Sequence, residues 1–227
     1  MNKLKSTLLY IFTFILGYAF FVLPDIIFGV FKSLGGKQGI NLLWMALFQF
    51  ISVTLLVRWS LKKKGKSLQH IGLTKPQWKH ILLGTLFGMV WWALQVLYIF
   101  PITEADFTYT LSHFDGSWSG AIFFLCLGVI GGGITEEIFN RGYTITGMKD
   151  LFENKKLGLI IATSFSILVF AIGHLPGNTL EWIDILVPTS VYTALYLITG
   201  RLTSSIFAHG VYNAGMIIYL QMQYVAV

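Results

Sequence analysis

Two adjacent glutamates, Glu136 and Glu137, follow an apolar run in the C-terminal half of the chain. Arg141 lies four residues after Glu137, so on a helix the two side chains share a face and can form an ion pair. Glu136 points about 100° away from Glu137 around the helix axis, which leaves its carboxylate free to face another helix. A carboxylate that is not held by a cation can accept a proton from water. We therefore predict that Glu136 is a general base.

Two histidines and an asparagine lie in later apolar runs. His174 ends one run, while His209 and Asn213 lie four residues apart in the last, where a helix would place them on one face. Ionisable groups at membrane depth are costly and usually face a protein interior or a wet cavity. Each side chain also has a structural interpretation: His174 as a packing residue, Asn213 as an interhelical hydrogen-bonding residue, and Glu137 with Arg141 as a structural ion pair.

The composition places these residues in a membrane protein. Of the 227 residues, 55% are hydrophobic and 11% are charged, whereas soluble domains carry about 25% charged residues. The mean hydropathy is +0.70. A single cysteine, Cys126, excludes a disulfide scaffold. These values also exclude an ordinary soluble enzyme and a disordered chain.

Seven apolar runs are long enough to cross a bilayer, for which a helix needs roughly 20 apolar residues. Backbone groups in lipid must bond internally, and the runs lack the alternation of a barrel, so we expect helices. The prediction is an all-α polytopic membrane protein with one domain, residues 1–227, and about seven transmembrane helices. An additional re-entrant or split segment would bring the number of membrane helices to eight. Pro24 should kink or end the first run. The runs lie near residues 7–31, 40–60, 81–100, 119–140, 157–175, 180–199 and 202–224.

Basic residues predict an orientation. The net charge is +6, and seven of the sixteen Lys and Arg residues lie in one segment, Arg58–Lys79. If the crossings alternate from the N-terminus, fourteen of the sixteen share a side with that segment, and only Lys32 and Lys37 lie on the other. The positive-inside rule then makes the N-terminus and the 61–80 loop cytoplasmic, in a multi-pass protein of the cell membrane. The basic residues face the bilayer surface, and no nucleic acid is expected as a partner. The opposite side carries the carboxylates Glu104, Asp106, Asp115, Glu181 and Asp184.

Sequence spacing predicts the depth of two candidate residues. The turn near Lys155 lies 19 residues after Glu136 and 19 residues before His174. An antiparallel hairpin folded at this turn places both side chains at the same level, provided that the helix of Glu136 continues to the turn. His209 lies only eight residues after Arg201, so the same argument does not give its depth.

Glycines precede the two glutamates. The run Gly131–Gly133 favours either the close approach of another helix or a local break. Gly128 with Gly132 repeats the small-xxx-small pattern of tightly packed membrane helices. We therefore expect another helix to pack against this segment.

Three motifs carry a resemblance to a known family. Residues 136–141 read Glu-Glu-Ile-Phe-Asn-Arg and match its Glu-Glu-x-x-x-Arg motif. Residues 170–174 match its Phe-x-x-x-His motif, and residues 209–213 match its His-x-x-x-Asn/Asp motif. All three lie in the family's order within residues 131–213. The chain thus resembles the CPBP (CAAX protease and bacteriocin-processing, or Abi) intramembrane endopeptidases, which are related to type II CAAX prenyl endopeptidases.

The resemblance implies a glutamic intramembrane protease that needs no cofactor. Its implied substrate is a membrane peptide or a prenylated or lipid-associated protein, and its implied setting is bacteriocin immunity or peptide processing. Carried over position by position, the motifs give a general base, a water-positioning histidine, two oxyanion donors and two supporting residues: Glu136, His174, His209, Asn213, Glu137 and Arg141, respectively.

Two alternatives stay open. The first is a zinc-dependent protease in which His174, His209 and Glu136 bind the metal. The second is a non-enzymatic immunity or scaffold protein that keeps the cavity and binds a peptide or another membrane protein. The sequence contains neither a Gly-x-Ser-x-Gly elbow nor a His-Glu-x-x-His motif, so it gives no support to a serine hydrolase or a zincin.

Overall fold

The computed structural model describes residues 2–103 and 105–225, so Glu104 lies outside the described residues. All regular secondary structure in these residues is helical, which confirms the predicted all-α class. The helices α3 and α6, which begin at Trp78 and Trp118, continue through the wider, π-wound turns η3 and η4. The elements are α1 Lys3–Val30, η1 Lys32–Leu34, α2 Ile40–Lys63, η2 Leu68–Ile71, α3 Trp78–Leu94, η3 Gln95–Ile99, α4 Phe100–Ile102, α5 Thr108–Leu111, α6 Trp118–Cys126, η4 Leu127–Ile145, α7 Thr146–Lys149, α8 Lys155–Gly173, α9 Thr179–Thr199 and α10 Leu202–Tyr224.

Six helices in the described ranges are long and apolar enough to cross a membrane, and they correspond to the first six predicted runs within a few residues at each end. The seventh run forms α10, which has 23 residues but is not among the six, because His209, Asn213 and Gln221 lower its mean hydropathy. The chain is a multi-pass membrane protein. The six spans are Lys3–Val30, Ile40–Lys63, Trp78–Ile102, Trp118–Lys149, Lys155–Gly173 and Thr179–Thr199.

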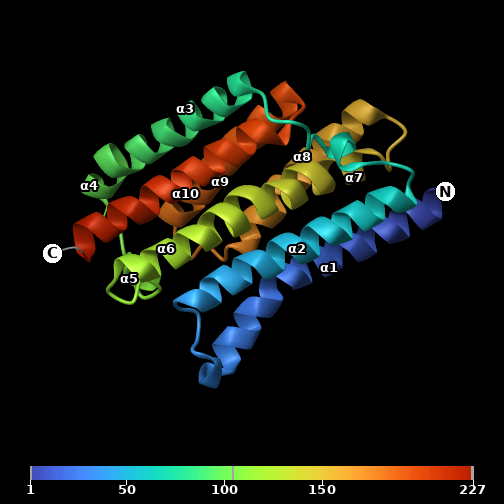
Figure 1. Cartoon of the computed structure of the whole chain (residues 1–227). Coiled ribbons are helices and arrows are strands. Elements are labelled where there is room, and N and C mark those ends of the chain that lie inside the picture. Colours follow the sequence, from blue (N-terminus) through green and yellow to red (C-terminus); the bar gives the residue numbers. More distant parts are fainter. Residues whose placement is uncertain (1, 104, 226–227) are drawn as a thin grey trace.

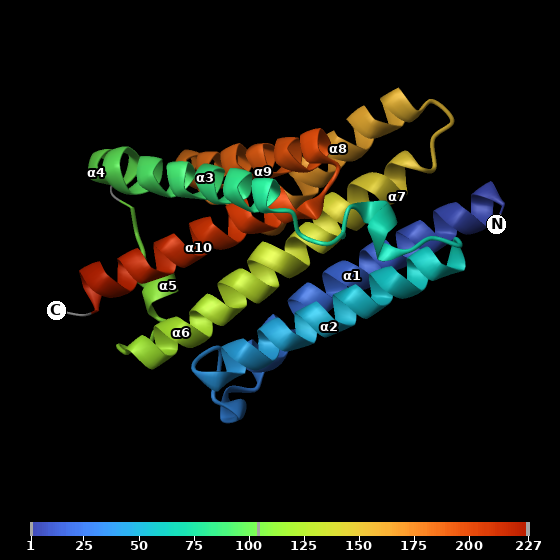
Figure 2. The same cartoon turned by 45° about the horizontal axis from the view of Figure 1, so that its top comes forward.

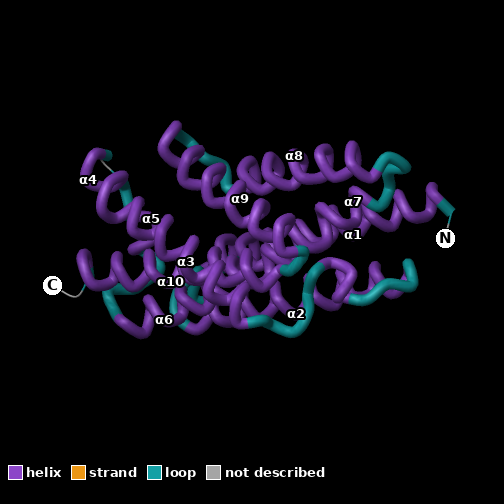
Figure 3. Tube along the Cα trace, turned by 90° about the horizontal axis from the view of Figure 1, so that it is seen from above, coloured by secondary structure: helices purple, strands orange, loops and turns teal. Residues whose placement is uncertain are grey.

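The helix α10 occupies the middle of the bundle. It lies between α3 and the continuous helix α6–η4–α7, and it also contacts α9 (Figures 1 and 2). On the far side of α6–η4–α7, α2 packs against η4, and α1 packs against α2. Seen from above, α8 and α9 lie on one side of the bundle, and α2 and α6 lie on the opposite side (Figure 3). The polar residues of α10 are thus surrounded by other helices.

Small residues allow α10 and η4 to approach closely. A Cβ atom placed on Gly133 would lie 2.8 Å from the Cα atom of Gly210, closer than real Cβ atoms come to other atoms. The glycine run therefore supports close packing, and the helix continues through it to Lys149 without a break. The π winding of η4 departs from the ordinary α-helix that the sequence predicts, and π segments often occur at functional sites.

The first helix bends at Pro24. The proline lies inside α1, which continues to Val30, and the ribbon changes direction there (Figure 1). Proline lacks the N–H group that would bond to the preceding turn, and its ring crowds that turn's carbonyl. The expected kink is therefore present, and Asp25 at the kink forms an ion pair with Lys37, with Nζ 2.7 Å from Oδ1.

The 61–80 loop is tied to the end of α7 by a charged cluster. Lys66 Nζ lies 2.5 Å and His70 Nε2 lies 2.8 Å from the same oxygen of Asp150. Partial burial raises the pKa of Asp150, but the hydrogen bonds and charges of Lys66 and His70 outweigh this effect and hold the pKa below the ordinary value of 3.8. A carboxylate of this kind stabilises the folded state wherever it is ionised.

We expect Asp150→Asn to lower the free energy of unfolding by about 1 kcal/mol at pH 7, because the cluster is partly exposed to solvent. The folded pKa of Asp150 lies below 3.8, so this contribution is complete above that pH and is lost as the pH falls through the folded pKa. Thermal unfolding of both proteins in detergent at pH 7, 5 and 3 measures the difference. A difference already lost at pH 5 would contradict the lowered pKa.

Candidate active site

One cavity collects the four residues that the sequence predicts to be catalytic. It has a volume of about 280 Å³, and its lining includes Glu136, His174, His209 and Asn213. Glu136 comes from η4, His174 follows the last residue of α8, and the other two come from α10. The hairpin between η4 and α8 therefore brings Glu136 and His174 to the same cavity, as the equal spacing from Lys155 predicts. The depth of His209, which the sequence left open, matches theirs.

The two adjacent glutamates have different surroundings. Glu137 is fully buried, and its Oε1 atom lies 3.0 Å from Arg141 Nη1 and 3.0 Å from His209 Nδ1. Glu136 is only partly buried and lines the cavity. The expected ion pair of Glu137 with Arg141 is present. The sequence did not predict that Glu137 also holds His209, which lies 72 residues away.

Arg141 is held between aromatic rings. Its side chain is 1% exposed, and the carbon of its guanidinium group lies 4.4 Å from the centre of the Phe170 ring and 5.8 Å from that of Tyr192. The negative faces of aromatic rings attract a cation, most strongly when water is excluded. The phenylalanine of the Phe-x-x-x-His motif thus packs against the arginine of the Glu-Glu-x-x-x-Arg motif, and together they support Glu137.

His209 is fixed by two contacts. Its ring stacks on Tyr192 with the centres 4.9 Å apart, and its Nδ1 atom donates to the carboxylate of Glu137. A carboxylate only accepts hydrogen bonds, so Nδ1 carries a proton and Nε2 is the atom left for the cavity. Nε2 points toward Gly132, since a Cβ atom placed there would lie 3.7 Å from it. The glycine keeps this space open, one helical turn before Glu136.

Asn213 points to the same place. A Cβ atom on Gly132 would lie 2.8 Å from Asn213 Nδ2, which also donates to the carbonyl oxygen of Gly128 at 2.8 Å. An amide group has two N–H bonds. One N–H bond of Asn213 donates to the carbonyl of Gly128, which agrees with the interpretation of Asn213 as an interhelical hydrogen-bonding residue. The other N–H is free to bind a group in the cavity.

His174 caps the end of α8. Its Nδ1 atom lies 2.8 Å from the carbonyl oxygen of Phe170, and the two rings are 4.4 Å apart. Because a carbonyl accepts, Nδ1 is the donor, and the neutral ring keeps a lone pair on Nε2. A histidine in this state can accept a hydrogen bond from water.

Further residues around the site were not singled out from the sequence. Asp25, at the kink of α1, and Gln49, in the middle of α2, both line the cavity. Gln49 donates to the carbonyl of Phe21 at 3.1 Å and is buried. Gln49 could have been predicted as a site residue because it is polar and lies in the middle of an apolar run. Asp25 could have been predicted because it is an acidic residue directly after Pro24.

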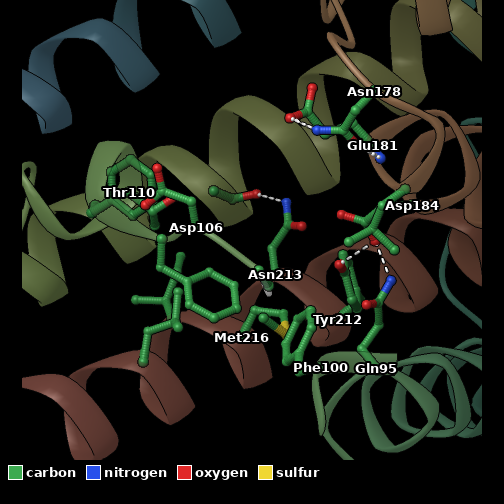
Figure 4. A pocket seen from close by; sticks show the side chains of 17 residues that line it. Gln95, Phe100, Asp106, Thr110, Asn178, Glu181, Asp184, Tyr212, Asn213 and Met216 are labelled. Carbon is green, nitrogen blue, oxygen red and sulfur yellow. Dashed lines mark hydrogen bonds between the residues drawn. The ribbon is translucent and has the colours of Figure 1, made fainter. Parts of the chain in front are cut away.

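A second cavity of about 440 Å³ adjoins the first (Figure 4). The two share Phe124, Gly128 and Asn213 in their linings. Asp184, which the sequence analysis groups with the carboxylates of the opposite side, lies in α9 and lines this second cavity. Its Oδ1 atom accepts from Tyr212 at 2.9 Å and from the amide of Gln95.

Comparison with protein families supports the resemblance drawn from the three motifs. Residues 116–215 match the family model described as type II CAAX prenyl endopeptidase Rce1-like. No match was found among curated proteins or among solved structures. The matched segment contains all three motifs and every residue that the cavity takes from η4, α8 and α10. The chain is therefore a multi-pass membrane protein whose residues 116–215 are similar to the type II CAAX prenyl endopeptidase Rce1-like family.

Proposed function

We propose that the chain is an intramembrane endopeptidase that hydrolyses a peptide bond with water activated by Glu136. The observation that carries the proposal is that Glu136 shares one cavity with two histidines and an amide, while its neighbour Glu137 is buried against Arg141. Among the described residues that line this cavity, Glu136 is the carboxylate without an ion pair, since Asp25 pairs with Lys37. The family match at residues 116–215 supports hydrolysis of peptides as the reaction.

The reaction needs a general base in its first step and a general acid in its second step. Glu136 accepts a proton from water, and the resulting hydroxide attacks the carbonyl carbon of the substrate. Glu136 then returns the proton to the nitrogen of the leaving amine as the C–N bond breaks, which yields a carboxylic acid and an amine. His174 accepts the second hydrogen of the water on Nε2 and so orients the lone pair of the water toward the carbonyl.

The negative charge of the tetrahedral intermediate falls on the carbonyl oxygen. Asn213 offers its free N–H, and His209 donates from Nε2 when its ring is an imidazolium. Glu137 accepts a hydrogen bond from Nδ1 and so fixes the orientation of the ring. In this proposal Glu137 and Arg141 position His209 and do not touch the substrate.

The position of the site among apolar helices supports a substrate that is associated with the membrane. We propose a membrane-associated peptide or a prenylated or other lipid-linked protein, and processing of such a peptide, including bacteriocin immunity, as the setting. A non-enzymatic immunity or scaffold protein would use the same cavity for binding alone. Mass spectrometry of membrane peptides incubated with the protein in nanodiscs distinguishes cleavage from binding.

Chelation tests the zinc-dependent alternative. Among residues 2–103 and 105–225, no three His, Cys, Asp or Glu side chains are grouped so that they could hold a metal. We expect cleavage to continue within about twofold after exhaustive treatment with EDTA, because Glu136 activates the water directly. Stoichiometric zinc in active protein, with activity lost on its removal and restored on its return, would overturn the glutamic mechanism.

The proposed orientation places the 61–80 loop in the cytoplasm. In a Cys126→Ala background, a cysteine introduced by Lys64→Cys should react in intact cells only with a membrane-permeant thiol reagent. The reason is the excess of basic residues at that end of the bundle. Labelling by an impermeant maleimide in intact cells would reverse the orientation, and Lys37→Cys serves as the control for the opposite side.

A further inference from the structure

The second cavity has an acidic lining. Three carboxylates border it, those of Asp106, Glu181 and Asp184, and its described lining contains no Lys, Arg or His. Two of the three are already used by nearby groups. Asp106 caps the N–H of Thr108 at 2.8 Å. Both oxygens of Glu181 accept hydrogen bonds within its own turn, from the side chain of Asn178 and from a backbone N–H.

Asp184 differs from these two because one of its oxygens is free. Oδ1 accepts from Tyr212 and Gln95, whereas Oδ2 accepts from no group in the described residues. Figure 4 shows the carboxylate with one oxygen turned toward Gln95 and Tyr212 and the other turned into the cavity. A carboxylate in a partly buried cavity is most stable when a donor or a cation meets its free oxygen.

Gln95 provides an independent sign of a missing ligand. Its side chain is 1% exposed and lines the same cavity, and its Nε2 atom donates to Asp184. Its Oε1 atom is buried and has no partner among the described residues. Buried polar atoms in folded proteins nearly always have partners. Asp184 Oδ2 and Gln95 Oε1 are thus two acceptors on residues of one cavity that lack a donor among the described residues.

The chemistry of two unmet acceptors and a negative charge selects the ligand. An ammonium group brings three N–H donors and a positive charge, and a guanidinium group brings five. Either can bind the free carboxylate oxygen and keeps further N–H donors for a neighbouring acceptor such as the amide oxygen. A neutral amide could meet the acceptors but not the charge, and a carboxylate would be repelled.

The position of the cavity relates this ligand to the proposed reaction. Asn213 and Gly128, which are joined by a hydrogen bond, line both the second cavity and the cavity of Glu136. A peptide held with its carbonyl at Asn213 can extend a neighbouring side chain toward Asp184. We propose that the second cavity is a substrate subsite for a Lys or Arg side chain, with Asp184 as its specificity-determining residue. This proposal rests on the proposed endopeptidase function for the identity of the ligand as a peptide.

Peptide binding to the Glu136→Gln protein in nanodiscs tests the subsite without hydrolysis. The probes are apolar decapeptides in which one residue, scanned along the chain, is Lys or the matched Gln. We expect the Lys peptide to bind about tenfold more tightly than the Gln peptide at one position, and this ratio to fall below twofold when Asp184→Asn is added. Gln95→Met, which keeps the charge, should reduce the ratio at least threefold. Glu153→Gln, at the other end of the bundle, should leave it unchanged.

The ratio is internal to each protein, so a loss of folded protein does not alter it. Equal binding of Lys and Gln peptides at every position overturns the subsite, whether or not Asp184→Asn folds. A Lys preference that persists in both the Asp184→Asn and the Gln95→Met proteins overturns it as well. Failure of the parent protein to cleave any peptide, with the Lys preference retained, contradicts the endopeptidase and not the subsite.

Discussion

Replacing Glu136 by Gln should reduce the rate of peptide hydrolysis by about 10²–10⁴-fold, the usual contribution of a general base. Glutamine has nearly the same shape, but its amide cannot accept the proton of water. Glu136 is partly exposed to the cavity and forms no ion pair within the described residues, so the folded state should tolerate the change. The measurement is kcat/KM for a cleaved peptide in nanodiscs, with thermal unfolding as the control for folding. Turnover within threefold of the parent would remove Glu136 as the base.

Replacing Glu137 by Gln should instead lower the stability of the folded protein. Glu137→Gln leaves the guanidinium of Arg141 buried without a negative partner, and breaking a buried ion pair costs about 3–5 kcal/mol. We expect the midpoint of thermal unfolding in detergent to fall by about 10 °C. The matched control is Glu153→Gln, which breaks an exposed pair with Lys3 and should change the midpoint by about 1 °C.

A second control separates the lost ion pair from other effects at position 137. Adding Arg141→Gln to Glu137→Gln removes the unpaired charge, so the double variant should recover part of the lost stability. Equal midpoints for Glu137→Gln and Glu153→Gln would show that Glu137 does not support the fold. In that case Glu137 could not be the residue that positions His209.

Local spacing predicts much of the site. The ion pair of Glu137 with Arg141 follows from a four-residue separation, and the shared level of Glu136 and His174 follows from equal distances to the turn near Lys155. Both predictions use the rise of a helix and one turn. These predictions depend on few assumptions. The ion pair and the shared level are both present even though η4 is π-wound.

Contacts between distant helices could not be predicted in this way. The hydrogen bond of His209 with Glu137 and the stacking of Tyr192 on His209 depend on how α9 and α10 rotate against η4. The position of Asp25 depends on the bend at Pro24, whose direction the sequence does not specify. Side-chain rotation around a helix axis is set by packing, and packing is a property of all the neighbouring helices together.

The polar character of α10 also has a consequence for how the protein is made. A helix with His209, Asn213 and Gln221 partitions into lipid less readily than its six apolar companions. It gains stability from its contacts with α3, η4 and α9, so we expect it to enter the bilayer after these helices. We therefore expect membrane insertion in two stages: the six apolar helices enter first, and the polar helix α10 then inserts between them. Since α10 brings His209 and Asn213, the proposed active site would stay incomplete until α10 has been inserted.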